Sequence, residues 1–505
     1  MNFRITDPFT ASHTMNRLTH HVLAALLTSL LGAATSAHAV TPLPSASTFL
    51  YGWNVHLAST YQYGTPPALS DRLVSSGANT YRDAEEWAWT DYGPTAGTFR
   101  YGADLNAAVA QISGRLQPAG LMGLQILGFE NTLYWQQATQ DITANPATAG
   151  SVFQTYAKGF RTYAQQQLAR RPGQGLYQIG NEWNGGFHLN RAMPNYTLVR
   201  DGDTYARLYL SVAADLRTRV PQARLLTGGL ADCAASPTLP YGMCWPWLID
   251  QLAHAKRLGG SLSLIDGLGI HAYADYDPVA IPERLYSGLV TGRNWLMAQS
   301  PAYAASPKDF YLTETGIPTI TSSGQAITES LQADYLQRMA LLYRTLPYVK
   351  GVWFYEFANQ PLTGREGTFG AVTASLVDKP AFAPMKALAP LVIRGTNWKL
   401  VSGDVKVTDW AKRLTDQWIL YRPTKLYTVE CDYTDPADGK PKRITAFWAP
   451  QGTLPVTVQT AGTTVAHRTA FAGTSTTRSG TFALTATSSP QFLIRPAGVG
   501  SVLVK

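Results

Sequence analysis

Short apolar or aromatic runs recur along residues 49 to 387, and longer amphipathic stretches separate them. The runs are apolar at nearly every position, which is typical of strands buried on both faces of a parallel sheet. We therefore predict eight strands, at Phe49–His56, Ala78–Asp83, Leu121–Gly128, Leu176–Glu182, Ala223–Leu230, Ile265–Tyr273, Asp309–Glu314 and Val349–Phe357.

The stretches between these runs carry apolar side chains at helical spacing. In Ser151–Leu168, apolar and aromatic residues recur every three or four positions, as one buried helix face requires. Thr204–Val220 and Glu329–Leu346 show similar spacing. Strands that alternate with helices build a parallel sheet, so eight such units in one segment predict an α/β fold, a (β/α)₈ TIM barrel.

The pattern changes near residue 389. Beyond this point, short alternating segments rich in threonine, valine and glycine are separated by turn residues, which is typical of an antiparallel β-sandwich. We predict a catalytic barrel over residues 40–388 and a smaller all-β sandwich over residues 389–505. Because no flexible Ser/Gly/Pro-rich linker joins them, we expect the sandwich to brace the barrel, with glycan binding as the alternative.

Residues 1–39 have the pattern of a secretory signal peptide. Arg17 precedes the apolar segment Val22–Gly32, and Ala37-His38-Ala39 supplies the small residues of a cleavage site. The apolar segment is too short for a bilayer span of about 20 residues, so an uncleaved anchor is the weaker alternative. We predict export to the periplasm or the extracellular space, with no stable membrane span after cleavage.

Composition narrows the class of partner. Hydrophobic residues make up 45% of the chain, which excludes a disordered protein, whereas charged residues make up 15%, below the usual value of about 25%. The net charge of +8 is spread thinly, with no basic run longer than Arg170-Arg171, which argues against a nucleic-acid partner. We expect a monomer with few charges on its surface, suited to a hydroxyl-rich partner.

Cysteines and acidic motifs give little sign of a metal or a cofactor. An exported protein can oxidise its cysteines, and a local disulfide between Cys233 and Cys244 would leave Cys431 over. No CxxC or Cys/His cluster indicates zinc. The acidic segment 432–439 invites a calcium interpretation, but its spacing does not match an EF-hand loop and favours a polar turn. We predict no metal and no cofactor.

Two glutamates stand at the carboxyl ends of predicted strands, where a parallel barrel carries its chemistry. The fourth strand ends in Asn181-Glu182, and the seventh ends at Glu314. An Asn-Glu pair is common by chance, and Glu314 alone would suit a helix cap or a surface acid. Two carboxylates facing one cavity, however, are the groups that cleave glycosidic bonds, one as proton donor and one as ionised nucleophile.

With these motifs, the barrel segment resembles the clan A retaining (β/α)₈ glycoside hydrolases, in which an Asn-Glu pair ends strand four and a lone glutamate ends strand seven. The resemblance implies that Glu182 is the general acid/base and Glu314 the nucleophile. It also implies that Asn181 hydrogen-bonds the 2-hydroxyl of the sugar.

The resemblance extends to further strand ends. Arg82 resembles the arginine that keeps the nucleophile ionised, and His271 and Tyr273 resemble the active-site histidine and tyrosine. Trp353 resembles the tryptophan that forms the floor of the sugar-binding subsite before the scissile bond. Each has a structural alternative: Arg82 as an ion-pair partner of Asp83, Glu85 or Glu86, His271 as a satisfied core histidine, and Trp353 as a core residue.

Other candidates lack an accompanying motif. Glu130 and Glu356 lie near the ends of strands three and eight and are candidates to bind substrate hydroxyls, and His56 is either a substrate contact or scaffold. Four tryptophans fall in predicted strand-to-helix loops, where an aromatic face can stack on a sugar ring or simply pack: Trp87, Trp89, Trp135 and Trp183.

Within the clan, a barrel followed by a β-sandwich is most similar to family 39 and also to families 5, 30, 51 and 79. This resemblance implies a secreted retaining hydrolase that acts on a polysaccharide or oligosaccharide. We expect an enzyme that cleaves within the chain of its substrate, and a bacterial exopolysaccharide is one candidate substrate. The alternative is an exo-acting xylosidase, arabinosidase or glucuronidase. A non-catalytic carbohydrate-binding barrel is the alternative from a different class, and the presence of both glutamates weighs against it.

Overall fold

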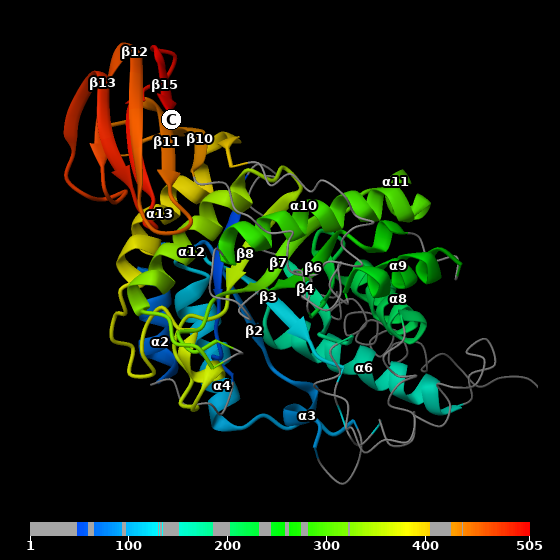
Figure 1. Ribbon diagram of the computed structural model, residues 1–505. Helices are drawn as coiled ribbons and strands as arrows, with labels where there is room; N and C mark the ends of the chain where they lie inside the picture. The colour runs from blue at the N-terminus through cyan, green and yellow to red at the C-terminus, as the bar shows by residue number, and fades with distance from the viewer. Residues whose placement is uncertain are drawn as a thin grey trace, which may run out of the picture. The chain divides into compact units, whose positions relative to one another are not determined.

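The computed structural model describes residues 48–58, 65–92, 97–129, 131, 134, 151–184, 202–231, 244–257, 262–273, 281–321, 324–403, 426–436 and 438–505. Eight parallel strands form a closed barrel in which successive strands are neighbours and the eighth pairs with the first, which confirms the predicted TIM barrel (Figure 1). The strands are β1 (Leu50–Asn54), β2 (Thr80–Ala84), β3 (Met122–Leu127), β4 (Leu176–Asn181), β5 (Arg224–Gly229), β6 (Gly267–Ala272), β7 (Asp309–Thr315) and β8 (Val349–Phe354).

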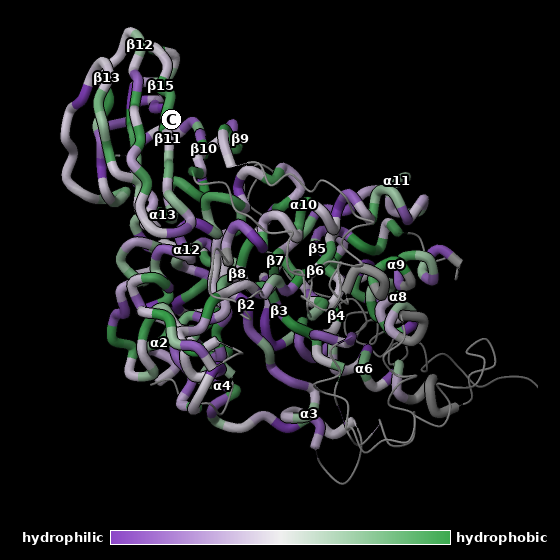
Figure 2. The backbone as a smooth tube through the Cα atoms, viewed as in Figure 1, coloured by the Kyte–Doolittle hydropathy of each residue, from purple (hydrophilic) through white to green (hydrophobic). Residues whose placement is uncertain are grey.

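Helices surround these strands, and along them hydrophobic and hydrophilic residues alternate, as expected for elements with one buried face (Figure 2). Pro66 and Pro67 start the first of them, and the Thr328 hydroxyl caps α12 by accepting from the Leu331 amide. The helices are α2 (Pro66–Ser75), α3 (Trp87–Thr90), α4 (Ala103–Gln111), α6 (Ser151–Arg170), α8 (Gly202–Arg219), α9 (Cys244–Arg257), α10 (Ile281–Gln299), α11 (Pro301–Ala305), α12 (Glu329–Arg344) and α13 (Phe382–Arg394), with the short helices η1 (Ile112–Leu116), η2 (Leu262–Leu264) and η3 (Arg365–Thr368).

The barrel interior changes from apolar to polar along the strands, because alternate residues of each strand point inwards. One closed apolar cluster fills the part nearer the amino ends: Leu50, Met122, Leu124, Leu176, Leu226, Tyr311 and Trp353. Later in β1, β2 and β4, the side chains of Asn54, Arg82 and Gln178 hydrogen-bond to one another instead. The carboxyl end of the barrel therefore carries polar groups above an apolar base.

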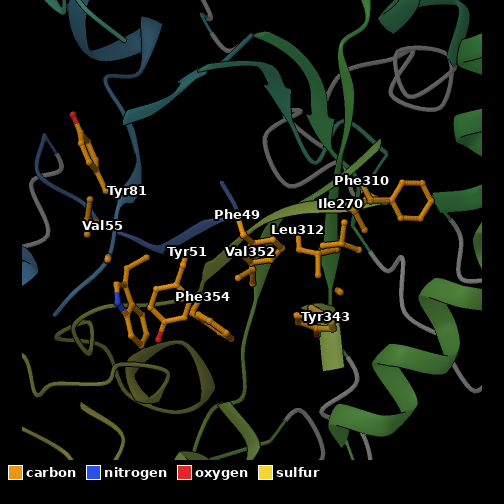
Figure 3. Close-up of a cluster of buried hydrophobic side chains, with 14 of the residues drawn as sticks. Phe49, Tyr51, Val55, Tyr81, Ile270, Phe310, Leu312, Tyr343, Val352 and Phe354 are labelled. Carbon is orange, nitrogen blue, oxygen red and sulfur yellow. The ribbon is translucent and has the colours of Figure 1, made fainter. Parts of the chain in front are cut away.

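The outward-facing residues of the strands pack against the helices. Figure 3 shows this layer, in which Phe310, Leu312 and Val352 of the strands lie near Tyr343 of α12. The Tyr51 hydroxyl also donates to the Met385 carbonyl of α13, at 3.0 Å. These contacts tie the wall of the barrel to its outer helices.

The C-terminal segment forms a seven-stranded antiparallel sheet, in agreement with the predicted β-sandwich. The long strand β12 pairs with β15 over Val458–Ala461 and with β14 over Ala466–Arg468, and a register shift after Gln459 separates the two parts. The strands are β9 (Thr396–Ser402), β10 (Tyr427–Thr434), β11 (Pro441–Trp448), β12 (Leu454–Arg468), β13 (Thr476–Ala486), β14 (Gln491–Pro496) and β15 (Ser501–Val504).

The two faces of β11 belong to different cores. Phe447 packs in a small cluster internal to the sandwich, whereas Ile444 and Trp448 belong to the same core as the barrel helices. The Trp448 indole N–H also donates to Glu283 of α10 at 2.7 Å, and the Ser488 hydroxyl donates to Asp334 of α12 at 2.6 Å. The sandwich thus shares its core with the barrel, as a bracing domain would.

The last barrel helix extends past the expected domain boundary at residue 388. Helix α13 continues to Arg394, with Pro390 inside it, and β9 starts at Thr396. The sequence predicted a boundary here because the pattern of the chain changes after this point. The predicted signal peptide lies outside the described residues, and so does Cys233. Every helix of the described segments is too short or too polar to cross a lipid bilayer.

Candidate active site

Glu182 directly follows strand β4, and the backbone around it has an unusual conformation. Gly180 has φ +84°, and a Cβ there would lie 2.4 Å from the Phe129 ring, so the position requires glycine. Glu182 itself has φ +41°, a conformation that few residues other than glycine adopt, and its amide donates to the Gly229 carbonyl at 2.7 Å. Such conformations cluster at functional sites.

A register shift between β6 and β7 brings Glu314 into the same site. Ile270 pairs with Leu312, but the next residue, His271, pairs with Glu314, so Thr313 is an extra residue on β7. Leu312 faces the outer helices, and strict alternation would turn Glu314 the same way. A bulge re-aims a side chain, and here it directs Glu314 towards the barrel interior.

His271 lies between the two carboxylates. Its Nδ1 is 2.6 Å from Glu182 Oε1 and 3.4 Å from Glu314 Oε2. The two carboxylates each have an oxygen within 4.8 Å of the other and of a ring nitrogen of His271. His271 is fully buried, so it contacts the two acids rather than solvent. The sequence placed these three residues at strand ends, and the fold brings them together.

Arg82 fixes this cluster from β2. Its guanidinium donates to Glu314 Oε1 at 2.7 Å, to Asn181 Oδ1 at 2.6 Å, to Gln178 Oε1 at 2.9 Å and to Asn54 Oδ1 at 2.5 Å. These bonds hold the Asn181 carboxamide oxygen, and so set the orientation of its amide NH₂ group. Asn54 and Gln178 were not identified from the sequence.

Two of the alternative partners of Arg82, Asp83 and Glu85, bond to other arginines. Asp83 accepts from Arg171 at 3.0 Å, and Glu85 accepts from Arg170 at 2.9 Å and from Arg171 at 3.2 Å. Alternation along β2 explains this, because Asp83 faces the helices when Arg82 faces the interior. Arg82 therefore pairs with the candidate nucleophile and not with the adjacent acids.

The surroundings of Glu314 favour its ionised form. Burial alone would raise its pKa, but nearby His271 and Arg82, and hydrogen bonds from Tyr273 and Arg82, outweigh burial and hold the pKa of Glu314 below its usual value. The Tyr273 hydroxyl donates to Glu314 Oε2 at 2.8 Å. A carboxylate that stays ionised is suited to nucleophilic attack.

A glycine on β5 makes room for His271. A Cβ at Gly229 would lie 1.8 Å from His271 Nε2, closer than any two such atoms can approach. Any side chain at this position must displace the imidazole and, with it, the contact to Glu182. Gly229 carried no signal in the sequence analysis because its importance depends on a neighbour in space.

A second histidine–carboxylate pair adjoins the site. His56, after β1, lies 3.2 Å from Glu356, after β8, and its ring meets Tyr355 edge to face at 6.2 Å. Burial opposes protonation of His56, but the hydrogen bond and charge of Glu356 outweigh it and raise the pKa of the imidazole. His56 is 27% exposed, whereas Glu356 is buried.

The structure does not support the interpretation of Trp353 as the floor of a subsite. Its ring is completely buried in the apolar base of the barrel, where the indole N–H donates to the Thr80 hydroxyl at 3.2 Å. Trp353 lies in that base, and the rings that pack against Tyr273 are those of Phe369 and Tyr355, with centres 5.9 Å and 6.3 Å away.

The loop tryptophans differ in exposure. Trp87 is fully buried, and Trp183 packs against Phe129 and is 4% exposed, so neither presents a face to a sugar. Trp89 is 36% exposed. Glu130 and Trp135 lie outside the described residues.

Metal-ligating groups of the described segments converge only at Glu182, His271 and Glu314. Arg82 and Tyr273 already bond to Glu314, and a guanidinium next to a carboxylate opposes the binding of a second cation. The acidic turn of the sandwich is neutralised by lysine and arginine, since Asp435 bonds to Lys442 and Asp432 to Arg443. That arrangement is the polar turn expected from the sequence.

Comparisons with known proteins place the fold. No protein-family profile matches the chain, and no curated protein is similar to it in sequence. Among solved structures, a family 39 glycoside hydrolase from Bacteroides cellulosilyticus is similar over 90% of this chain and 83% of its own, with a TM-score of 0.56 and 17% identity.

Two arabinofuranosidases show the same architecture. A family 51 α-L-arabinofuranosidase from Bifidobacterium longum is similar over 91% of this chain and 98% of its own, with a TM-score of 0.53 and 12% identity. An α-L-arabinofuranosidase from Thermotoga maritima is similar over 90% of this chain and 97% of its own, with a TM-score of 0.51 and 12% identity. At these identities the likeness shows that the chain has the barrel-plus-sandwich fold of glycoside hydrolases.

Proposed function

We propose that this protein is a retaining glycoside hydrolase in which Glu314 is the nucleophile and Glu182 the general acid/base. The observation that carries the proposal is the separation of the two glutamates, which have oxygens within 4.8 Å of each other. Retaining enzymes hold their carboxyl groups about 5–5.5 Å apart, whereas inverting enzymes need about 6.5–9.5 Å to admit a water molecule.

In the first step, the Glu314 carboxylate attacks the anomeric carbon while Glu182 protonates the departing glycosidic oxygen. Arg82 and Tyr273 bind the two oxygens of Glu314, so they hold the nucleophile in place and ionised. Asn181, fixed by Arg82 on its carboxamide oxygen, is oriented to donate its NH₂ to a sugar hydroxyl.

In the second step, Glu182 takes a proton from water, and the water oxygen attacks the anomeric carbon and releases Glu314. His271 contacts both glutamates, so it positions them relative to each other throughout the cycle. Two displacements at the same carbon give net retention of configuration.

The substrate proposed here is a polysaccharide or oligosaccharide, with endo-action preferred over exo-action, and the protein is taken to be exported and monomeric. The neighbours with glycosidase names support the general activity, and the sequence pattern of residues 1–39 supports export. Binding of carbohydrate without cleavage would instead favour the non-catalytic alternative.

The decisive experiment is a screen of the purified protein against polysaccharides and oligosaccharides, with the first-formed anomer identified by NMR. Retention at the anomeric carbon is expected, and inverted product would refute the assignment of Glu314 as nucleophile. Glu182→Ala should lose most activity and recover part of it with azide, which can replace water as the attacking group. Near-normal turnover of Glu182→Ala would reject its role.

A further inference from the structure

A second arginine lies close to the candidate nucleophile and has no part in the proposed reaction steps. Arg365 is the first residue of η3, between β8 and α13. Its guanidinium carbon is 5.5 Å from the centre of the Tyr273 ring and 4.7 Å from that of Phe369. Because Tyr273 donates to Glu314, a single side chain separates Arg365 from the nucleophile.

Arg365 rests on a packed aromatic cluster. The rings of Tyr273, Tyr355 and Phe369 meet edge to face, with centres 5.1 to 6.3 Å apart. A guanidinium over such rings is attracted to their π-electrons. The cation is therefore held beside the site by the aromatic rings.

The two arginines near Glu314 differ in their engagement. Arg82 is 3% exposed and bonds to four side chains of the barrel interior, so it has little capacity for a ligand. Arg365 is 28% exposed, and one of its interactions is an ion pair with the adjacent Glu366, which is 48% exposed. Exposed ion pairs contribute little free energy, so a ligand carboxylate can replace Glu366 at small cost.

The surrounding charges show what this cation can do. Glu182 and Glu314 lie near Tyr273, and Glu356 follows Tyr355 directly in the chain. These three carboxylates would repel an anionic substrate unless a cation balanced them. We propose that Arg365 binds a carboxylate of the substrate and that the enzyme acts on an acidic, uronic-acid-containing polysaccharide. The inference rests on the proposed function, and it uses the bidentate geometry with which arginine recognises carboxylates.

The test compares acidic polysaccharides with their carboxyl-reduced forms, which keep the same backbone and linkage. Polygalacturonate, alginate and glucuronoxylan are the probes, and both binding and release of reducing ends are measured. For at least one probe, the wild-type protein should favour the acidic form by about tenfold or more, the effect of one charged hydrogen bond. Added salt should weaken this preference.

Two substitutions assign the preference to Arg365. Arg365→Met keeps the long apolar stem over Phe369 but removes the charge, and it should abolish the preference for the acidic form. Arg478→Met is the matched control, because Arg478 also lies over a ring, 5.9 Å from Phe482, but in the sandwich strand β13. The control should keep the wild-type preference.

The outcomes separate this inference from the proposed function. Equal cleavage of acidic and reduced forms, or an unchanged preference in Arg365→Met, overturns the role of Arg365 while leaving hydrolysis intact. Preferential binding that depends on Arg365, without release of reducing ends, supports the carboxylate site and refutes the hydrolase. Binding of none of the three acidic probes overturns the inference.

Discussion

Two buried arginine–glutamate pairs in this chain have the same chemistry and different surroundings. Arg338 and Glu283 are both fully buried between α12 and α10, and Trp448 of the sandwich adds a donor to Glu283 Oε1, where Arg338 Nε already donates at 2.9 Å. Arg82 and Glu314 lie at the carboxyl end of the barrel, where 11% of the Glu314 side chain is exposed.

The difference lies in what else faces each glutamate. Among the described residues, the groups that bond to Glu283 are all donors, so its charge is balanced and its position is that of a structural joint. Glu314 lies within 4.8 Å of a second acid, Glu182. Placing two carboxylates together opposes folding, and the proposed reaction requires such an arrangement. The balance of charge around the glutamate therefore distinguishes the Arg338–Glu283 pair, which joins the two domains, from the Arg82–Glu314 pair, which belongs to the proposed reaction.

The largest expected effect is on activity. Glu314→Gln keeps the size of the side chain but removes the nucleophile, so kcat should fall by about 10⁴-fold or more. Thermal unfolding of the same variant should show a smaller loss of stability than the matching change Glu283→Gln. Substantial turnover by Glu314→Gln would place the reaction elsewhere and remove the contrast between the pairs.

The same Glu→Gln change in the Arg338–Glu283 pair should lower stability and leave activity unchanged. Glu283→Gln leaves the Arg338 charge buried without a counter-ion, which costs about 3–5 kcal/mol in comparable buried pairs. Urea unfolding followed by fluorescence measures this loss, and kcat/KM of the folded fraction should stay close to that of the wild type. A variant as stable as the wild type would show that the pair does not hold the domains.

A smaller loss of stability should follow when only the hydrogen bond from the sandwich to Glu283 is removed. Trp448→Phe keeps an aromatic ring stacked on Tyr427, whose centre lies 5.7 Å away, but deletes the N–H that bonds to Glu283. The free energy of unfolding should fall by about 1–2 kcal/mol. Trp89→Phe is the control, because this side chain is exposed and its change should have little effect.

The smallest effect concerns pH. The Tyr273 hydrogen bond favours ionised Glu314, so Tyr273→Phe should raise the pKa of Glu314 and move the acid limb of kcat/KM to higher pH, by about one unit or less. The control is Tyr355→Phe, whose hydroxyl accepts from Gln360 at 2.6 Å. An acid limb that moves equally in both variants would contradict a specific role for Tyr273.

The sequence predicted the strands, and the position of both glutamates at strand ends, because these depend on local pattern. Each apolar run became a barrel strand, and parallel strands bring their carboxyl ends to one edge whatever their separation in the chain. Trp353 points into the barrel as expected, but it lies in the apolar base, because the sequence does not show how far along β8 that base extends. Tyr355, two residues further on, points the same way and packs against Tyr273.

Other parts of the site depend on contacts that no local pattern records. The bulge at Thr313 turns Glu314 inwards, but nothing in the surrounding run of residues marks it. Asn54 and Gln178 become partners of Arg82 only when β1, β2 and β4 close into a barrel. Arg338, in the middle of an amphipathic helix, gives no sign in the sequence that it is buried against Glu283 of another helix.

The glycine beneath His271 limits how this protein can evolve. At Gly229 even alanine would collide with the imidazole, so any substitution there would displace His271 from its contact with Glu182. In a library that samples all residues at each position, codon 229 should tolerate glycine alone, whereas exposed positions such as Gly102, which has open space around it, should accept many residues. A change of substrate specificity must therefore come from substitutions at positions farther from the two glutamates, while Gly229 and His271 stay unchanged.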